Sequence, residues 1–334
     1  MAIRVAINGF GRIGRLVFRA IHERGGVEVA AINDLGSVAA NAHLLKYDSI
    51  HGRFQGEIRT GEDWIDVGHG KVRVLAERDP AKLPWKSLGV DVALECTGLF
   101  TKREAAAKHL EAGARRVLVS APADGVDFTL VMGVNSDQVT REHQVISNGS
   151  CTTNCLAPVA YVLNEGIGIA RGYMTTIHSY TGDQNIVDSL HKDIRRARAA
   201  ALSMIPTSTG AARAMGLVMP SLKGKLDGTS IRVPTADVSV VDLAFDAARD
   251  TSAEEINWLM TDAAKSNRFK GILAVNRDET VSVDFIHDPH SAIFDLTQTV
   301  VLDKRFCRVL AWYDNEWGFS NRMVEAAALL GALG

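Results

Sequence analysis

Cysteine, excess charge and long apolar runs are all scarce in this sequence. Only four of its 334 residues are cysteines, whereas small secreted scaffolds held by disulfides are shorter and richer in cysteine. The formal net charge is −2, which argues against nucleic acid as the main partner, because such proteins usually present a strongly basic face. No run approaches the ~18 consecutive apolar residues of a membrane-spanning helix, so no membrane partner is expected either.

The N-terminus has no basic segment followed by a long apolar run, so we expect no secretory signal. We therefore expect a cytoplasmic protein whose thiols stay reduced and can do chemistry. Hydrophobic residues make up 46% of the chain and charged residues 23%, an ordinary globular composition. The length suits two domains, each large enough to bury its own core.

Strand and helix signals alternate in the first half of the chain. A short apolar strand at 4–7 is followed by helical spacing of apolar residues over 12–23 and by a second apolar strand at 27–32. The theme continues with expected strands at 72–75, 90–94, 117–120 and 130–132 and an expected helix at 102–112. Strands that alternate with helices favour an α/β fold with a Rossmann-type doubly wound parallel sheet.

The second half has longer strand patterns, and their alternation favours an α+β domain with a largely antiparallel sheet. The expected strands are 173–180, 229–233, 238–245, 281–286, 292–302 and 305–313, and a helix at 209–219 would cover one face. The change falls near Gly149. We expect a first domain at 1–149, a catalytic domain at 150–314, and a C-terminal segment, 315–334, whose helix packs back on the first domain.

A glycine pattern, Gly9-x-Gly11-x-x-Gly14, follows the first strand and opens a helix. Gly9 allows the tight turn, Gly11 lets the backbone approach a pyrophosphate, and Gly14 lets helix and strand pack closely. Asp34 ends the next strand, where it can accept hydrogen bonds from a ribose diol. A glycine-rich turn without a ligand is the alternative, but in this context the pattern predicts NAD binding in the first domain.

Cys151 opens an expected helix at 151–163, with Ser150 as its N-cap. In the first helical turn the helix dipole favours a thiolate, which is a good nucleophile toward a carbonyl. The alternative is a buried core thiol, the role we expect for the other three cysteines. The Cys-x3-Cys spacing of Cys151 and Cys155 is poor for zinc without further ligands, so no metal site is expected.

A thiolate needs a base, and His178 is the candidate because it ends a strand and opens a polar turn. A hydrogen-bonded core histidine is the alternative. Phosphate could bind at 207–210, which begins a helix pattern. Four arginines are candidate clamps for phosphate: Arg195, Arg196, Arg198 and Arg232. For the cluster at 192–198, a solvated loop or a subunit contact is the competing interpretation.

At six places the chain is similar to phosphorylating glyceraldehyde-3-phosphate dehydrogenases, and the similarity runs nearly end to end. The segments are Asn8-Gly-Phe-Gly-Arg-Ile-Gly-Arg15, Ser150-Cys-Thr-Thr-Asn-Cys155, His178-Ser-Tyr-Thr-Gly-Asp-Gln184, Arg195-Arg-Ala-Arg198, Pro206-Thr-Ser-Thr-Gly210 and Tyr313-Asp-Asn-Glu-Trp-Gly318. The second segment is highly specific to this family. The resemblance implies an NAD-dependent aldehyde dehydrogenase with Cys151 as nucleophile and His178 as base.

The resemblance also implies the residues of a cofactor site and of two phosphate sites. The implied cofactor contacts are Arg12 and Ile13 to the pyrophosphate, Asp34 to the adenosine ribose, and Arg78, Ser120 and Asn315, with Asn315 orienting the nicotinamide amide. The residues implied to hold attacking inorganic phosphate are Ser150, Thr152, Thr209 and Gly210. Those implied to hold the substrate phosphate and its neighbour are Thr181, Asp183, Arg196 and Arg232. A loop at about 180–204 crosses a subunit interface in the family, which implies a homotetramer.

We therefore expect oxidation of D-glyceraldehyde 3-phosphate to 1,3-bisphosphoglycerate through a Cys151 thioester, with NAD reduced and inorganic phosphate consumed. An erythrose-4-phosphate dehydrogenase of the same fold is the nearest alternative, and Thr181 with the 207–210 segment disfavours it. A non-catalytic nucleotide- or RNA-binding role would need no Cys–His pair. NAD is expected over NADP, because the Asp34 carboxylate would repel a ribose 2′-phosphate.

Overall fold

The computed structural model describes residues 2–334 and divides them into two compact units. The first unit contains the residues up to Leu130, Gln138–Gly149 and Ser320–Gly334, and the second contains Val131–Asp137 and Ser150–Phe319. Each unit is built on its own sheet. Among the described residues, no helix combines the length and the apolar character needed to cross a membrane.

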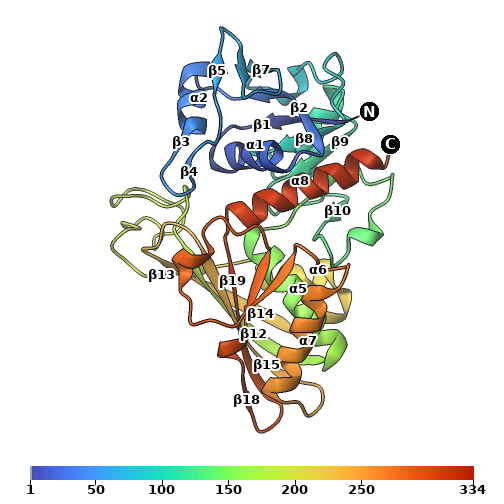
Figure 1. Ribbon diagram of the computed structural model, residues 1–334, viewed down its shortest axis with the longest axis vertical. Helices are drawn as coiled ribbons and strands as arrows, with labels where there is room; N and C mark the ends of the chain where they lie inside the picture. The colour runs from blue at the N-terminus through green and yellow to red at the C-terminus, as the bar shows by residue number, and fades with distance from the viewer. Residues whose placement is uncertain (1) are drawn as a thin grey trace. The chain divides into compact units, whose positions relative to one another are not determined.

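The first unit holds a nine-stranded sheet in the order β10-β11-β9-β8-β1-β2-β7-β6-β5 (Figure 1). The strands are β1 Ile3–Asn8, β2 Val27–Asn33, β5 Arg59–Thr60, β6 Trp64–Asp66, β7 Lys71–Leu75, β8 Val92–Glu95, β9 Arg116–Val119, β10 Phe128–Thr129 and β11 Val145–Ser147, with a separate hairpin of β3 Tyr47–Asp48 and β4 Gly52–Arg53. Neighbours from β10 to β7 are parallel, and β6 and β5 continue as an antiparallel edge. The expected Rossmann-type parallel sheet is confirmed.

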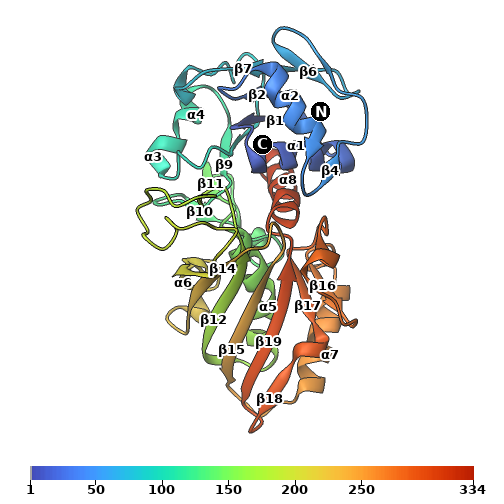
Figure 2. The same ribbon diagram turned by 90° about the vertical axis from the view of Figure 1, so that its left-hand side faces the viewer.

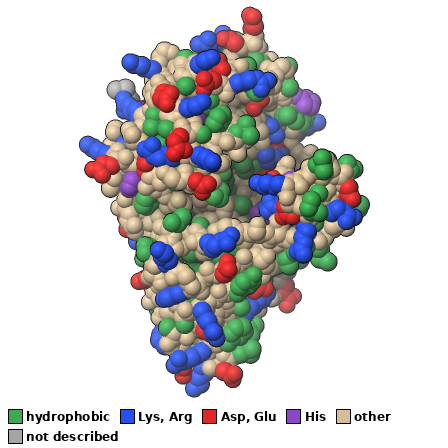
Figure 3. Space-filling model, turned by 180° about the vertical axis from the view of Figure 1, so that it is seen from behind, with side chains coloured by type: hydrophobic (Ala, Val, Ile, Leu, Met, Phe, Trp, Pro, Cys, Tyr) green, Lys and Arg blue, Asp and Glu red, His purple; other side chains and the backbone are tan. Residues whose placement is uncertain are grey.

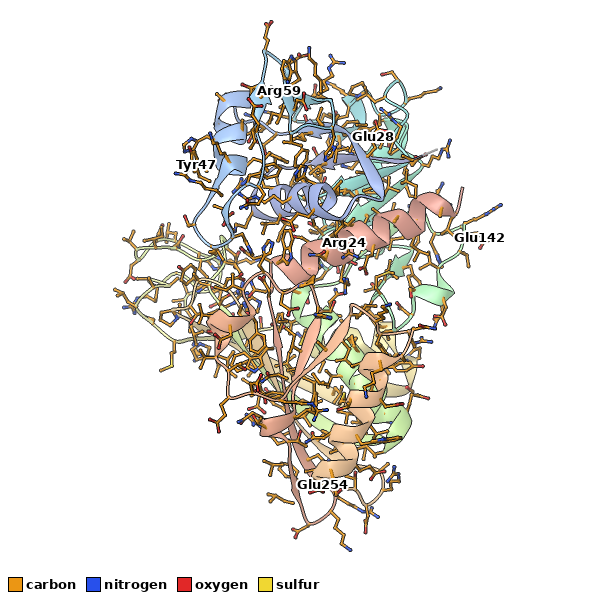
Figure 4. All side chains as sticks on the ribbon, viewed as in Figure 1. Arg24, Glu28, Tyr47, Arg59, Glu142 and Glu254 are labelled. Atoms are coloured by element: carbon orange, nitrogen blue, oxygen red, sulfur yellow. The ribbon has the colours of Figure 1, made fainter. Side chains whose placement is uncertain are left out.

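The strand order reverses at β1, which has β2 on one side and β8 on the other. Such a switch point leaves a crevice at the carboxyl ends of the strands. The helices of this unit are α1 Arg12–Arg24, α2 Val38–Lys46, α3 Arg103–Ala106, α4 Lys108–Glu111 and the part of α8 (Trp317–Ala332) from Ser320 onward. Arg24, labelled in Figure 4, donates to Asn321 and to Glu325, each at 2.7 Å, which ties α1 to this part of α8.

Two expectations for this region were wrong in detail. The apolar segment 130–132 is not a strand, because β10 stops at Thr129 and the chain turns at Gly133, which has a φ of 78°. Val131 is instead buried in the core of the second unit, so its apolar character serves that core. The helix expected at 102–112 is split into α3 and α4, with Ala107 at the junction.

The second unit holds an eight-stranded sheet in the order β13-β14-β12-β15-β19-β17-β16, with β18 also paired to β19. The strands are β12 Ile169–Ser179, β13 Ile205–Ser208, β14 Leu226–Val233, β15 Ser239–Ala247, β16 Leu273–Asn276, β17 Ala292–Asp295, β18 Val300–Leu302 and β19 Phe306–Tyr313. Figure 2 shows β12, β15, β19 and β17 side by side. The pairs β12–β14 and β16–β17 are parallel and the rest are antiparallel, so the largely antiparallel sheet is confirmed.

Three helices cover one face of this sheet (Figure 1): α5 Cys151–Gly166, α6 Ala211–Val218 and α7 Ala253–Lys265. The sequence analysis did not identify α7. The strand expected at 281–286 was wrong, since Ser282–Phe285 is a 3₁₀ turn in which Asp284 accepts the Val281 N–H at 2.8 Å. A local side chain to backbone bond of this kind competes with strand pairing, and residue alternation does not reveal it.

Candidate active site

The glycine pattern shapes a cleft of about 350 Å³ at the carboxyl ends of β1 and β2. Gly9 has a φ of 91°, and a Cβ there would lie 2.7 Å from the Thr97 nitrogen. A Cβ on Gly14 would lie 2.0 Å from the Gly9 carbonyl oxygen, so α1 and β1 can pack this closely only around glycine. A Cβ on Gly11 would meet no described atom within 4 Å, which leaves this backbone open to a ligand.

Asp34 lines the same cleft and stabilises the glycine turn by hydrogen bonding to it. Its carboxylate accepts the Phe10 N–H and the Gly36 N–H, both at 2.8 Å. Arg78 also lines the cleft, and Ser120 hydrogen-bonds to the thiol of Cys96, another lining residue. These features fit a dinucleotide, with the open turn for the pyrophosphate and a carboxylate for the ribose diol.

Arg12 and Ile13 begin α1 directly behind Gly11, and no side chain of the described residues caps the first turn of this helix. The Arg12 guanidinium bonds to Asp48 at 2.6 and 3.1 Å. Burial opposes ionisation of Asp48, but Arg12 and the backbone N–H groups of Ile50 and His51 bring its pKa down to about 2. The side chain of Arg12 is thus committed to Asp48, and the backbone of this turn carries the potential phosphate donors.

The second unit brings Cys151 and His178 together, although 27 positions separate them. Ser150 caps α5 by accepting the Thr153 N–H at 3.0 Å, which places Cys151 in the first turn of the helix. His178 stands near the end of β12, the central strand beside α5. The Sγ of Cys151 lies 3.4 Å from Nε2 of His178. This distance is within hydrogen-bond reach for a sulfur atom, as a nucleophile and its general base require.

The other ring nitrogen of His178 is held by the backbone. Nδ1 lies 2.7 Å from the Ser179 carbonyl oxygen, to which an Nδ1–H can donate. This tautomer leaves the lone pair of Nε2 facing Cys151. The bond between Nδ1 and the Ser179 carbonyl thus orients the imidazole so that Nε2 faces the Cys151 thiol.

Burial favours the neutral form of both groups in the free protein. Burial raises the pKa of the Cys151 thiol, although the Arg232 charge and N–H groups at the start of α5 act in the opposite direction. Burial and then Arg232 lower the pKa of His178 to about 3. From the sequence, the helix dipole and a base were considered but not desolvation, and desolvation raises the pKa of this thiol more than the other effects lower it. Proton transfer within the pair creates two opposite charges in contact, which stabilise each other.

Arg232 sits directly beside this pair. It is the register partner of His178 in the parallel pair β12–β14. Its Nη1 donates to the Ser179 carbonyl at 2.9 Å and reaches the Thr181 hydroxyl at 3.4 Å. Among the described residues, its buried Nε has no hydrogen-bond partner. A buried guanidinium with an unused donor is suited to bind an anion.

Arg196 is fixed by a second polar cluster. It pairs with Asp183 and donates from Nε to the Thr207 hydroxyl at 3.0 Å. Thr207 in turn donates to Asp193 at 2.6 Å. The charge of Arg196 contributes to lowering the pKa values of both His178 and Arg232, after the larger effect of burial. The structure therefore brings Thr181 to Arg232 and Asp183 to Arg196, and the two arginines are close enough for their charges to affect each other.

The residues expected around inorganic phosphate occupy two helix starts. Gly210 is the N-cap of α6, and the hydroxyl of Thr209 accepts the Ala211 N–H at 3.2 Å. Ser150 is the N-cap of α5. The side chain of Thr152 is buried and committed to Tyr313, whose hydroxyl lies 2.8 Å from it. Helix starts offer backbone N–H groups to anions.

Three site residues were missed by sequence reasoning. The Tyr313 hydroxyl bridges Thr152 and Thr176, and its ring meets His178 edge-on with centroids 6.0 Å apart. Ser179 and Ser239 donate to Oδ1 of Asn315 at 2.8 and 2.7 Å. These two bonds fix the flip of the amide, so Asn315 Nδ2 is its outward donor. The signal that could have identified them is their position, because each is a polar residue at the end of an expected apolar strand.

The chain matches two family models, described as glyceraldehyde 3-phosphate dehydrogenase, NAD binding domain, over residues 3–103, and glyceraldehyde 3-phosphate dehydrogenase, C-terminal domain, over residues 150–315. It is 62% identical to a glyceraldehyde-3-phosphate dehydrogenase of Cereibacter sphaeroides and 63% identical to one of Xanthobacter flavus, with 100% of each chain covered. A third relative of the same name, from Zymomonas mobilis, is 59% identical over 98% of each chain.

Proposed function

Because this chain belongs to the glyceraldehyde-3-phosphate dehydrogenase family, we propose that Cys151 is its covalent nucleophile and His178 its general base. The protein is an NAD-dependent phosphorylating dehydrogenase of glyceraldehyde 3-phosphate, and its relatives disfavour both the erythrose 4-phosphate and the non-catalytic alternatives. The contact of 3.4 Å between Sγ and Nε2 is the observation that carries the proposed roles.

In the first step His178 takes the Cys151 proton on Nε2, and the thiolate attacks the aldehyde carbon. His178 then returns this proton to the oxyanion, which gives a hemithioacetal and frees Nε2 to act as a base again. Bound NAD supplies the acceptor for the hydride that leaves this carbon. His178 takes the hydroxyl proton at the same time, which yields a thioester on Cys151. An oxygen of inorganic phosphate then attacks the thioester carbonyl, the C–S bond breaks, and the thiolate leaves from an acyl phosphate.

The anion sites divide in this scheme between the substrate phosphate and the attacking phosphate. Thr181, Asp183, Arg196 and Arg232 would hold the substrate phosphate and its neighbour, with Asp183 keeping Arg196 in place. Ser150, Thr152, Thr209 and Gly210 would surround the attacking phosphate at the starts of α5 and α6. The unused Nε of Arg232 supports an anion beside the Cys–His pair.

The open glycine turn of the first unit supports the NAD contacts that we propose there. The turn from Gly9 to Gly14, with Arg12 and Ile13, would hold the pyrophosphate, and Asp34 the adenosine ribose. Arg78 and Ser120 would complete this part of the site. Asn315 would orient the nicotinamide amide through its fixed donor. We assign 1–149 with 315–334 to the NAD-binding domain and 150–314 to the catalytic domain.

We propose a cytoplasmic homotetramer, and a loop of the second unit supports the proposed assembly. Between 181 and 204 no regular element forms, and three large apolar side chains are almost fully exposed there: Ile186 83%, Leu190 99% and Leu202 84%. Figure 3 shows this loop as the lobe at the right, where hydrophobic and basic side chains gather. An exposed apolar patch of this kind is typical of a subunit contact.

Steady-state kinetics with glyceraldehyde 3-phosphate and with erythrose 4-phosphate, each with and without inorganic phosphate, test the function. We expect the triose phosphate to give the higher kcat/KM and turnover to stop after one thioester per subunit when phosphate is absent. Sustained turnover without phosphate would contradict a phosphorylating enzyme. Light scattering coupled to size exclusion tests the tetramer, with Leu190→Asp as the variant expected to weaken it.

A further inference from the structure

Three buried polar side chains form a row across the carboxyl edge of the first sheet. Asn33, Asn8 and Glu95 end the adjacent strands β2, β1 and β8 and are register partners (Figure 1). Their exposed fractions are 4%, 3% and 1%. Asn33 Nδ2 donates to Asn8 Oδ1 at 2.7 Å, and Asn8 Nδ2 donates to Glu95 Oε2 at 2.6 Å. The row is therefore one continuous hydrogen-bond chain.

The row ends on His109 of α4, which is fully buried. Its Nδ1 lies 2.9 Å from the indole nitrogen of Trp85, and its Nε2 lies 2.9 Å from Glu95 Oε2. An indole N–H can only donate, so Nδ1 accepts and the ring proton is on Nε2. With this tautomer, Trp85, His109, Asn8 and Asn33 all donate in the direction of the Glu95 carboxylate, which polarises each bond.

The row ties together three loops that line the proposed cofactor cleft. The other carboxylate oxygen of Glu95 accepts the N–H of Thr97 at 2.8 Å and also its hydroxyl. Thr97 is the residue against which Gly9 packs. At the far end, Asn33 exchanges hydrogen bonds with the backbone of Glu77, at 2.8 and 2.9 Å, next to Arg78. The loops after β1, β7 and β8 are thus held in one register.

Stability alone is a weak reason for this arrangement. A buried carboxylate is costly even when it is well bonded, and apolar side chains of the same volume often fill such a position more stably. Among the described residues, the hydrogen-bond partners of Glu95 are amides, a hydroxyl and an imidazole, and they include no lysine or arginine to neutralise it. A buried polar network whose bonds are satisfied makes its surroundings rigid, which suits a row that holds the loops of a binding cleft.

We propose that His109 is a positioning residue for the cofactor, acting through Glu95 on Thr97 and Asn8 to hold the walls of the cleft. His109 itself does not line the cleft. The inference rests on the proposed assignment of this cleft to NAD. It predicts that loss of the His109 hydrogen bonds weakens NAD binding and leaves the chemistry of the second unit intact.

The test compares three variants: His109→Phe removes both bonds, Trp85→Phe removes the indole donor and keeps an aromatic ring, and His109→Gln can keep an acceptor for Trp85 and a donor to Glu95. For His109→Phe we expect the Kd and KM for NAD to rise roughly tenfold, with kcat at saturating NAD within about twofold of wild type. His109→Gln should restore most of the affinity, and Trp85→Phe should fall between. The alkylation rate of Cys151 without NAD should not change in any of them.

Unchanged NAD affinity in Trp85→Phe and in His109→Phe, with both folded, would make the row purely structural and overturn the inference. If His109→Phe does not fold, Trp85→Phe and His109→Gln decide, and equal NAD affinity in those two and in wild type overturns it likewise. Asp34→Ala distinguishes failure of this inference from failure of the assignment of the cleft to NAD. If Asp34→Ala weakens NAD binding but the His109 variants do not, only this inference fails. If none of them does, the cleft assignment fails as well.

Discussion

Arg232 and His178 are neighbours across two parallel strands, and Nη1 of the arginine lies 3.0 Å from Nδ1 of the histidine. Both groups also share the Ser179 carbonyl oxygen. The arginine therefore disfavours a second proton on the imidazole, and it favours the thiolate of Cys151. One positive charge acts on both partners of the proposed catalytic pair, and it does so before any phosphate binds.

Replacement of either partner of the pair should abolish most activity without unfolding the protein. Cys151→Ser should bind NAD but keep far less than a tenth of wild-type turnover, because an alkoxide is much harder to form than a thiolate. His178→Asn should lower kcat by roughly 10²–10⁴, the usual effect of losing a general base. It should also slow alkylation of Cys151 near neutral pH. Unchanged turnover and unchanged alkylation would remove His178 from the mechanism.

The buried imidazole also predicts a pH dependence of stability. Burial lowers the pKa of His178 to about 3 in the folded protein, against 6.5 for a solvated imidazole. Between these values the unfolded chain binds a proton that the folded chain does not, so stability falls as the pH falls from about 6.5 toward 3. Relative to His178→Asn, the wild type should lose about 1.4 kcal/mol per pH unit in this window. Denaturant unfolding at fixed protein concentration between pH 7 and 4.5 measures it, and parallel curves would contradict it.

Arg232→Ala should weaken the binding of phosphorylated aldehyde or inorganic phosphate. A charge-assisted bond to phosphate is worth about 1.5–3 kcal/mol, which corresponds to a roughly ten- to hundredfold rise in the apparent constant. The Kd for NAD should stay near normal. Arg171→Ala is the matched control, since Arg171 is exposed, pairs with Asp246 and makes none of these contacts. Equal effects of the two substitutions, or an equal loss of NAD affinity, would show that Arg232 is not the anion site.

Charge at Asp34 should set the choice between NAD and NADP. Its carboxylate is anchored by two backbone N–H groups, so it cannot easily turn away from a 2′-phosphate. Asp34→Asn keeps the size of the side chain and removes its charge, and its one amide oxygen can still accept one of the two backbone N–H groups. We expect this variant to gain kcat/KM with NADP and to lose affinity for NAD. If wild type used both cofactors equally well, or if the preference of the variant did not move, another residue would make the choice.

The first unit was predictable because its signals are local. Gly9, Gly11, Gly14 and Asp34 lie within one β–α–β stretch, so their spacing and the surrounding strand and helix signals are enough to predict their roles. The row from Asn33 to Glu95 was not predictable in the same way. It depends on which strands are neighbours and in which register, and no residue spacing encodes that β8 lies beside β1.

In the second unit, even more of the site depends on contacts between residues that are far apart in the sequence. Cys151 was singled out from its place at a helix start, but its contact with His178 depends on how α5 packs against β12. Arg232 lies 54 positions from His178 and meets it only through strand register. The raised thiol pKa could not be foreseen either, because it depends on burial, which sequence position does not give.

The row of buried side chains also limits how this sequence can vary over evolution. A lone change at His109, Asn8 or Asn33 would leave a buried hydrogen-bond partner unpaired, which costs free energy. Such positions should change together or not at all. Relatives without the histidine should also lack the indole of Trp85 and the carboxylate of Glu95, and an alignment of natural sequences would show these positions as one co-varying group.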